Sequence, residues 1–233
     1  MRPKLTQISA KNVNRKNEKS FVAGADIKEM VNASNIDKDW EWINSLNTSF
    51  NAQLTNASED YSLLAVQGPK ALEAMQALTD FNLADLAFYA HATTSFAGLE
   101  NIIVATTGYT GSGGVEIYCK NNDVAQLWKA IFKAGEAFGV QPIGLAARDT
   151  LRLEMGYCLY GNEINDSSSP IAAGLGWVTR PKTGFVNAES IGQQKENGTK
   201  NKLVGFELID RGIPRTGHDI VTENGDIIGK VTS

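Results

Sequence analysis

A glycine-rich segment followed by a carboxylate is the first part of this chain that could do chemistry. Residues 108–116 read Gly-Tyr-Thr-Gly-Ser-Gly-Gly-Val-Glu, and strand-like residues lie on both sides. The glycine spacing fits neither the lysine-containing phosphate loop nor a G-x-G-x-x-G turn, and a strand rather than a helix follows it. A glycine-rich hairpin loop is therefore one interpretation. That interpretation assigns no role to the carboxylate of Glu116.

Glu116 lies between Val115 and Ile117 on the expected strand, so its side chain points to the face opposite these two aliphatic residues. If that face lines a pocket, the carboxylate can accept two parallel hydrogen bonds from an amino-pyrimidinone edge such as that of a pterin. The alternative is a solvated charge on an open sheet face.

Two arginines form the second candidate constellation. Residues 144–154 read Gly-Leu-Ala-Ala-Arg-Asp-Thr-Leu-Arg-Leu-Glu, which places Arg148 and Arg152 four residues apart. On a helix this spacing puts both guanidinium groups on one face, where they suit a ligand that carries a carboxylate. The alternative is pairing within the chain, with Asp149 or Glu154, on a solvated helix.

Together with Cys-Leu-Tyr-Gly-Asn at residues 158–162 and Ser-Pro-Ile-Ala-Ala-Gly-Leu-Gly-Trp at residues 169–177, these motifs resemble the T-protein family of the glycine cleavage system. The resemblance runs from about Val31 to Ser233, with the family's N- and C-terminal parts missing. It implies an aminomethyltransferase that transfers a one-carbon unit from the aminomethyl-lipoyl H-protein to tetrahydrofolate and releases ammonia. Tetrahydrofolate and the lipoylated H-protein are thus the implied partners.

The resemblance also implies roles for individual residues. Glu116 matches the family's pterin-binding glutamate, Tyr109 would supply ring stacking or a hydroxyl, and Arg148 matches the folate-contacting arginine of the Ala-Arg-Asp motif. Arg152 is a further candidate for cofactor binding. The family's catalytic aspartate belongs to a Gly-Gly-x-x-Asp-Asp segment, which this sequence lacks. We therefore assign no catalytic residue and expect the chain by itself to be catalytically impaired.

The alternative function is a non-catalytic folate-binding module, such as a folate-dependent iron-sulfur assembly protein of the same superfamily. Those proteins carry a cysteine in a Gly-Cys-Tyr-x-Gly-Gln-Glu motif, and Cys158 occupies a similar position. This chain has Tyr157 before the cysteine and Asn162 in place of the glutamine, which weakens that interpretation. A fragment without a stable fold is a third possibility.

Composition narrows the classes of partner. The 233 residues carry a formal net charge of -4, and the pI is about 5.3, so no broad basic field favours nucleic acid. Two cysteines and two histidines could form a four-ligand zinc site only by using every one of them, so we expect no metal. The sequence has no apolar run of membrane-spanning length and no secretory signal, which predicts a cytoplasmic protein with no membrane partner.

The pattern of elements predicts an α+β fold with a ferredoxin-like split βαβ layer. The resemblance implies that this layer binds folate and that an incomplete C-terminal β-barrel follows it. Expected strands cover residues 61–66, 101–107 and 115–119. Helices are expected from Asn35 as N-cap through Phe50, from Pro69 past Leu78, over residues 124–132, and from Leu145 to Met155. Short strands are expected at 203–209, 218–222 and 227–231, the last two joined by an Asn-Gly turn.

The domain organisation follows from these elements. Residues 1–30 are expected to be unrelated or disordered, and residues 19–30 resemble a short enoyl-CoA hydratase segment. Residues 31–180 form the folate-binding α+β domain. Residues 181–202, which have few apolar anchors, form a linker, and residues 203–233 begin the β-barrel domain.

Overall fold

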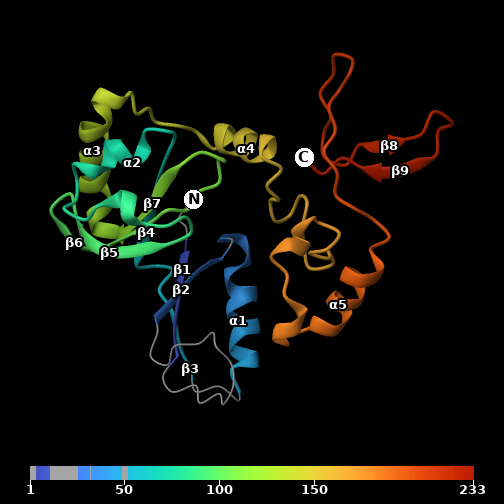
Figure 1. The fold of residues 1–233 in the computed structure, drawn as a ribbon, viewed down its shortest axis with the longest axis horizontal. Coiled ribbons are helices and arrows are strands. Elements are labelled where there is room, and N and C mark those ends of the chain that lie inside the picture. The colour runs from blue at the N-terminus through green and yellow to red at the C-terminus, as the bar shows by residue number, and fades with distance from the viewer. Residues whose placement is uncertain (1–3, 11–25, 32, 49–51) are drawn as a thin grey trace. The chain divides into compact units, whose positions relative to one another are not determined.

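The computed structural model of the chain describes residues 4–10, 26–31, 33–48 and 52–233 (Figure 1). It divides into two compact units, Met1–Ile143 and Gly144–Ser233, and each is described by itself below. Both contain helices and strands, which agrees with the expected mixed helix-and-sheet class.

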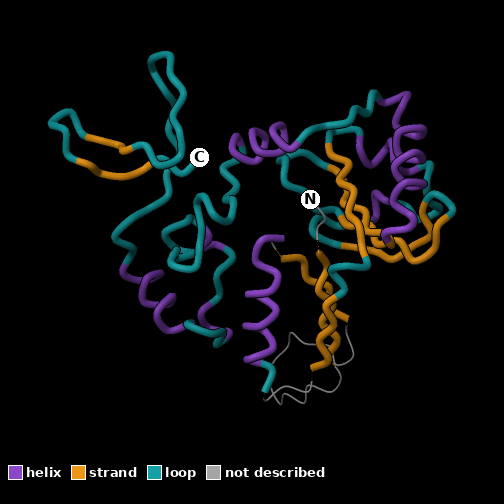
Figure 2. Tube along the Cα trace, turned by 180° about the vertical axis from the view of Figure 1, so that it is seen from behind, coloured by secondary structure: helices purple, strands orange, loops and turns teal. Residues whose placement is uncertain are grey.

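The N-terminal unit is built around a four-stranded sheet. Its strands are β4 (Tyr61–Gln67), β5 (His91–Phe96), β6 (Leu99–Ala105) and β7 (Gly114–Lys120), in the order β4-β7-β6-β5. Every neighbouring pair is antiparallel. Figure 2 shows the strands of this sheet side by side in orange. Because β7 lies between β4 and β6, those two strands run in the same direction, and the connection between them contains both α2 and β5.

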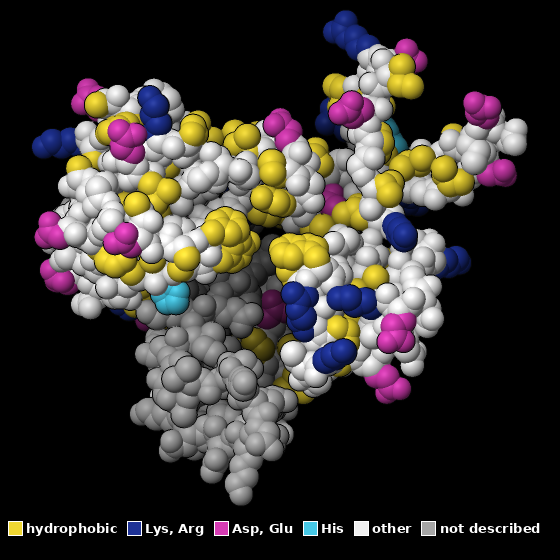
Figure 3. Space-filling view, in the orientation of Figure 1, with side chains coloured by type: hydrophobic (Ala, Val, Ile, Leu, Met, Phe, Trp, Pro, Cys, Tyr) yellow, Lys and Arg dark blue, Asp and Glu magenta, His cyan; other side chains and the backbone are white. Residues whose placement is uncertain are grey.

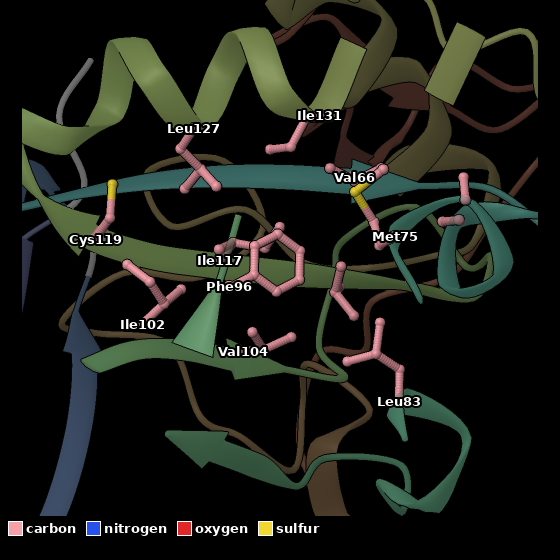
Figure 4. Close-up of a cluster of buried hydrophobic side chains, with 13 residues drawn as sticks. Val66, Met75, Leu83, Phe96, Ile102, Val104, Ile117, Cys119, Leu127 and Ile131 are labelled. Carbon is pink, nitrogen blue, oxygen red and sulfur yellow. The ribbon is translucent and has the colours of Figure 1, made fainter. Parts of the chain in front are cut away.

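Helices α2 (Ala71–Gln76) and α3 (Val124–Gly135) cover one face of this sheet. Met75 from α2 and Leu127 and Ile131 from α3 point onto the sheet, where Ile117 and Phe96 meet them (Figure 4). All five side chains are buried. Alternation along β7 therefore sends its aliphatic residues to the helix-covered face.

A second sheet in the same unit has three strands in the order β2-β1-β3, all antiparallel. They are β1 (Lys4–Ala10), β2 (Asp26–Val31) and β3 (Ala52–Asn56). Part of the segment 1–30, for which we expected no regular structure, thus forms strands. Its sequence lacks a two-residue alternation, so the pairing with β3, distant in sequence, is not visible locally. The enoyl-CoA hydratase-like residues before Asp26 lie outside the described residues.

Most of the expected elements of this unit are confirmed, with small shifts at their ends. Helix α1 covers Ile36–Leu46, while Phe50 lies outside the described residues. The helix expected from Pro69 begins at Ala71, after a turn in which the N–H of Ala71 bonds the carbonyl of Gly68 at 3.0 Å. Strand β5 was not predicted. It is an edge strand whose side chains are mostly polar, and three of the six are exposed, so it carries little hydrophobic signal.

The C-terminal unit contains helices α4 (Leu145–Glu154) and α5 (Ala188–Asn197) and a hairpin of β8 (Asp219–Val221) and β9 (Ile227–Lys230). The expectation of a helix from Leu145 is confirmed, as is the Asn-Gly hairpin. Six short 3-10 helices complete the described elements of both units: η1 (Ala33–Asn35), η2 (Leu83–Asp85), η3 (Asn121–Asp123), η4 (Glu136–Phe138), η5 (Leu175–Trp177) and η6 (Pro181–Thr183).

Two expectations for this unit differ from the structure. Residues 203–209 form no strand, and the side chains of Val204, Phe206 and Ile209 are 68%, 50% and 101% exposed. A strand needs a neighbour to complete its hydrogen-bond ladder, and this segment pairs with none in the described part of the chain. The expected linker 181–202 contains α5, anchored by the buried Ile191. Apolar side chains also lie exposed along the β8–β9 hairpin (Figure 3).

Candidate functional site

Glu116 lies on β7 and faces away from the helix-covered core, as strand alternation predicts. In the sheet register its neighbours are Ala65 on β4 and Ala105 on β6, so small methyl groups flank the carboxylate on both sides. The side chain is half-buried.

Two hydroxyl groups position this carboxylate. The Thr107 hydroxyl donates to Glu116 Oε2 at 2.5 Å, and the Tyr118 hydroxyl donates to the same oxygen at 3.3 Å. Burial and the charge of Glu116 raise the pKa of Tyr118, so its hydroxyl stays protonated and available as a donor. Both contacts fix the orientation of the carboxylate before any ligand arrives.

The glycine-rich loop joins β6 to β7, and Gln67 at the end of β4 connects its two sides. Gln67 Nε2 donates to the carbonyls of Thr107 at 3.2 Å and Val115 at 3.3 Å, and the Thr110 hydroxyl donates to Gln67 Oε1 at 3.1 Å. Gly114 permits this close approach, because a Cβ there would lie 2.4 Å from the carbonyl oxygen of Val66. Hydrogen bonds thus connect the loop and its two ends to β4 at several points.

Tyr109 lies within this loop and is half-buried. Together with Thr107 it belongs to the β6–β7 connection of the N-terminal unit, and Glu116 follows on β7. Gln67 and Thr107 were not singled out from the sequence. A glutamine or a threonine at the end of a strand has no distinctive pattern, and their roles depend on contacts between residues 9 to 48 positions apart.

Arg148 and Arg152 belong to α4 in the C-terminal unit, and their environments differ. Arg148 is exposed, whereas Arg152 is 1% exposed. An exposed guanidinium on a helix is available to a carboxylate-bearing ligand. The two arginines therefore do not form a matched pair.

Arg152 lies inside a polar network. Its Nε donates to Asp149 Oδ1 at 2.8 Å, its Nη1 to Glu163 Oε2 at 2.8 Å and its Nη2 to Ser233 Oγ at 2.8 Å. Nη1 also donates to the carbonyl of Tyr157 at 3.2 Å. The pairing with Asp149 is the alternative raised by the sequence. The second carboxylate is Glu163 rather than Glu154, and the site is buried rather than solvated.

Glu163 is the buried anion of this network, with 6% of its side chain exposed. Burial by itself would raise the pKa of Glu163, but hydrogen bonds, first from Ser233, and the nearby guanidinium together hold it below its ordinary value of 4.5. Glu163 Oε2 also accepts the backbone N–H of Leu159 at 2.9 Å. The network joins α4 to residues 157–163 and to Ser233.

Cys158 is half-buried next to this network, and burial raises the pKa of its thiol. Burial also raises the pKa of Cys119 to about 11. A raised pKa disfavours the thiolate, which is the reactive form. Both residues therefore behave as protonated thiols at neutral pH.

Three further findings concern other kinds of site in the described residues. A polar hollow at the opposite end of β7 is lined by Glu59, Asp60, Lys120, Asn121 and Asn122, and does not include Glu116. Among the described residues, no group of three His, Cys, Asp or Glu side chains is placed to hold a metal ion. None of the helices in the described ranges is long and apolar enough to cross a membrane.

Comparison with known proteins identifies relatives along most of the chain. An aminomethyltransferase from Flavobacterium psychrophilum is 55% identical over 204 residues, which are 88% of this chain and 56% of that protein. One from Bacteroides fragilis is 55% identical over 206 residues, or 88% of this chain and 57% of the relative. The chain thus spans somewhat more than half the length of these curated relatives.

The fold has a solved counterpart. The glycine cleavage system aminomethyltransferase T from Bartonella henselae matches 99% of this chain and 71% of its own length, with a TM-score of 0.84 and 24% identity. At 24% identity, this match establishes similarity of fold alone. The family model for the GCVT N-terminal domain covers residues 21–183, so its match begins before Val31. The chain therefore belongs to the GCVT N-terminal domain family.

Proposed function

We propose that this chain is part of an aminomethyltransferase of the glycine cleavage system. Such an enzyme transfers a one-carbon unit from the aminomethyl-lipoyl H-protein to tetrahydrofolate and releases ammonia. The relatives named aminomethyltransferase support this function, because they match 88% of the chain at 55% identity. The proposed setting is the cytoplasm, with the lipoylated H-protein as protein partner and no nucleic acid.

The tetrahydrofolate site in this proposal is centred on Glu116. The observation that carries it is a half-buried carboxylate on the sheet face opposite α2 and α3, oriented by Thr107 at 2.5 Å and Tyr118 at 3.3 Å. A carboxylate fixed in this way suits the amino and ring N–H donors of a pterin. Tyr109 completes the same loop as a stacking or hydroxyl contact.

Arg148 is the arginine that we propose for the glutamate end of folate. Its guanidinium is exposed on α4, so a carboxylate in solution can approach it. Arg152 was the second candidate for this role. Its burial and its contacts with Asp149 and Glu163 favour a structural role instead.

The finer domain organisation belongs to the same proposal. Residues 31–180 would form a ferredoxin-like folate-binding layer, which the β4-β7-β6 order supports. Residues 203–233 would contribute the first strands of a β-barrel, and the β8–β9 hairpin is consistent with that role.

The 233 residues by themselves are proposed to be catalytically impaired, because they contain no Gly-Gly-x-x-Asp-Asp segment. A carboxylate near the reacting nitrogen of folate would stabilise or relay charge there, and its loss removes that contribution. A coupled assay with lipoylated H-protein and tetrahydrofolate tests this point. Turnover equal to that of a full-length relative would contradict it.

Folate binding is tested separately, by thermal unfolding of the chain with and without a stable reduced folate. At a hundredfold excess over the dissociation constant, specific binding stabilises the folded state by about 2.7 kcal/mol, which raises Tm by roughly 5 to 10 °C. A cooperative transition that does not shift would refute a folate site in this chain.

A further inference from the structure

Two glycines of the segment 108–116 lie where any side chain would overlap Gln67. A Cβ at Gly108 would be 1.9 Å from Oε1 and 2.6 Å from Cδ of Gln67, and a Cβ at Gly114 would be 2.8 Å from its Nε2. Gly108 does not have a positive φ, so its backbone conformation does not by itself require glycine. The space at these two positions is taken by the amide of Gln67.

The surroundings of this amide dictate which way it points. Three backbone carbonyls, those of Val66, Thr107 and Val115, lie 3.2 to 3.3 Å from Nε2. Only an N–H donor is stable beside three acceptors, and Oε1 on the other side accepts the hydroxyl of Thr110 at 3.1 Å. A carboxylate or an apolar group in this place would leave the carbonyls without their donor.

Thr107 connects the amide to the carboxylate of Glu116. Its carbonyl accepts a hydrogen bond from Gln67 Nε2 at 3.2 Å, and its hydroxyl donates to Glu116 Oε2 at 2.5 Å. Gln67 also donates to the carbonyl of Val115, the residue directly before Glu116. One amide therefore holds the main chain on both sides of the hydrogen bond that orients the carboxylate.

We infer that Gln67 is a positioning residue for Glu116. It acts through the main chain of Thr107 and Val115, and the glycines at positions 108 and 114 leave room for its amide. The inference deepens the proposed function and rests on it for the ligand, because folate is what Glu116 is proposed to bind.

Gly108→Ala tests the inference without changing Gln67. The new methyl group would overlap the far end of a flexible side chain, so the amide is displaced while the backbone can stay in place. Calorimetric titration of the full chain with 5-formyltetrahydrofolate should show affinity reduced roughly 3- to 10-fold, the effect of losing one neutral hydrogen bond. The matched control is Gly113→Ala, because a Cβ at Gly113 meets no atom within 4 Å. It should bind the probe normally.

Gln67→Ala removes the amide outright and should weaken binding by a similar factor. Adding Gly108→Ala to this variant should cause no further loss, because no amide remains to be displaced. A further loss in the double variant would show that the methyl group acts on the ligand directly, which would overturn the inference.

Gln76→Ala is the control for the structural effect of losing a bridging amide. Gln76 lies on α2, on the helix-covered side of the sheet. Its side chain also bonds three main-chain groups, the carbonyls of Thr79 and Phe81 and the N–H of Leu83. Both alanine variants should lower Tm, but only Gln67→Ala should lose affinity for the probe.

The side-chain carboxyl ¹³C resonance of Glu116 reports on its hydrogen bonds before any ligand is added. In NMR spectra of the ligand-free chain it should shift in Gly108→Ala and Gln67→Ala, in the same direction as in Thr107→Val. It should keep its position in the two control variants.

The two readouts separate this inference from the proposed function. If the unaltered chain binds the probe while Gly108→Ala and Gln67→Ala bind it equally well, the inference is overturned and the proposed function stands. If the unaltered chain unfolds cooperatively and does not bind the probe, the proposed function fails. The resonance then decides the inference alone, and an unchanged resonance in both variants would overturn it.

Discussion

The hydroxyl of Thr107 and the carboxylate of Glu116 are joined by a 2.5 Å hydrogen bond across the two ends of the glycine-rich loop. The loop between them is further fixed by Gln67, whose amide donates to the Thr107 carbonyl at 3.2 Å. A carboxylate oriented by its own hairpin loses little freedom when it meets a ligand, which favours affinity. This relationship makes Glu116 the first residue to mutate.

Glu116→Gln should weaken binding of a reduced folate by about 10- to 100-fold, because a hydrogen bond to a charged group contributes about 1.5 to 3 kcal/mol. The substitution keeps the size of the side chain and removes its charge. Calorimetric titration measures the change. Glu73→Gln, at an exposed position on α2, is the control and should bind normally. Equal affinity in the two variants would remove Glu116 from the site.

Thr107→Val should weaken folate binding by roughly 3- to 10-fold, because the carboxylate loses its shorter hydrogen bond and with it a fixed orientation. Valine preserves the branched shape, so the effect reports on the hydroxyl. Thr107→Ser restores a hydroxyl and should recover most of the affinity, as measured by the same titration. If serine binds no better than valine, Thr107 does not act through hydrogen bonding.

The face on which Glu116 lies could be predicted from the sequence, because alternation along a strand depends only on neighbouring residues such as Val115 and Ile117. The same holds for α3, whose buried Leu127 and Ile131 recur at helical spacing. Local periodicity was sufficient in both cases.

Other features depend on residues far apart in sequence and could not be predicted in this way. The burial of Arg152 depends on Glu163 and Ser233, 11 and 81 positions away. Its spacing from Arg148 suggested a shared role, but spacing carries no information about which turn of a helix is covered. The apolar run 203–209 likewise has the composition of a strand, but strand formation requires a partner.

Arg152→Met should destabilise the C-terminal unit by about 3 to 5 kcal/mol, because it leaves Glu163 buried without its opposite charge. Urea unfolding measures the loss, with the chain kept free of ligand. Arg148→Met, one turn earlier on the same helix, is the control. Its side chain is exposed, so the change should stay within about 0.5 kcal/mol. Similar losses for the two variants would show that the Arg152 network is not a major source of stability.

The pH dependence of stability should report on Glu163. Because its pKa in the folded state is below its ordinary value of 4.5, the unfolded state binds a proton more readily than the folded state does. The ionised form therefore contributes stability above pH 4.5, and that contribution is lost as the pH falls through the folded-state pKa.

The variant Glu163→Gln tests this dependence, because it has no carboxyl group to titrate at that position. Between about pH 5 and pH 3, its unfolding free energy should fall less steeply than that of the unaltered chain. Urea titrations at several pH values measure both slopes, with Glu73→Gln as the exposed control. Identical slopes in the unaltered chain and Glu163→Gln would show that Glu163 titrates alike in the folded and unfolded states.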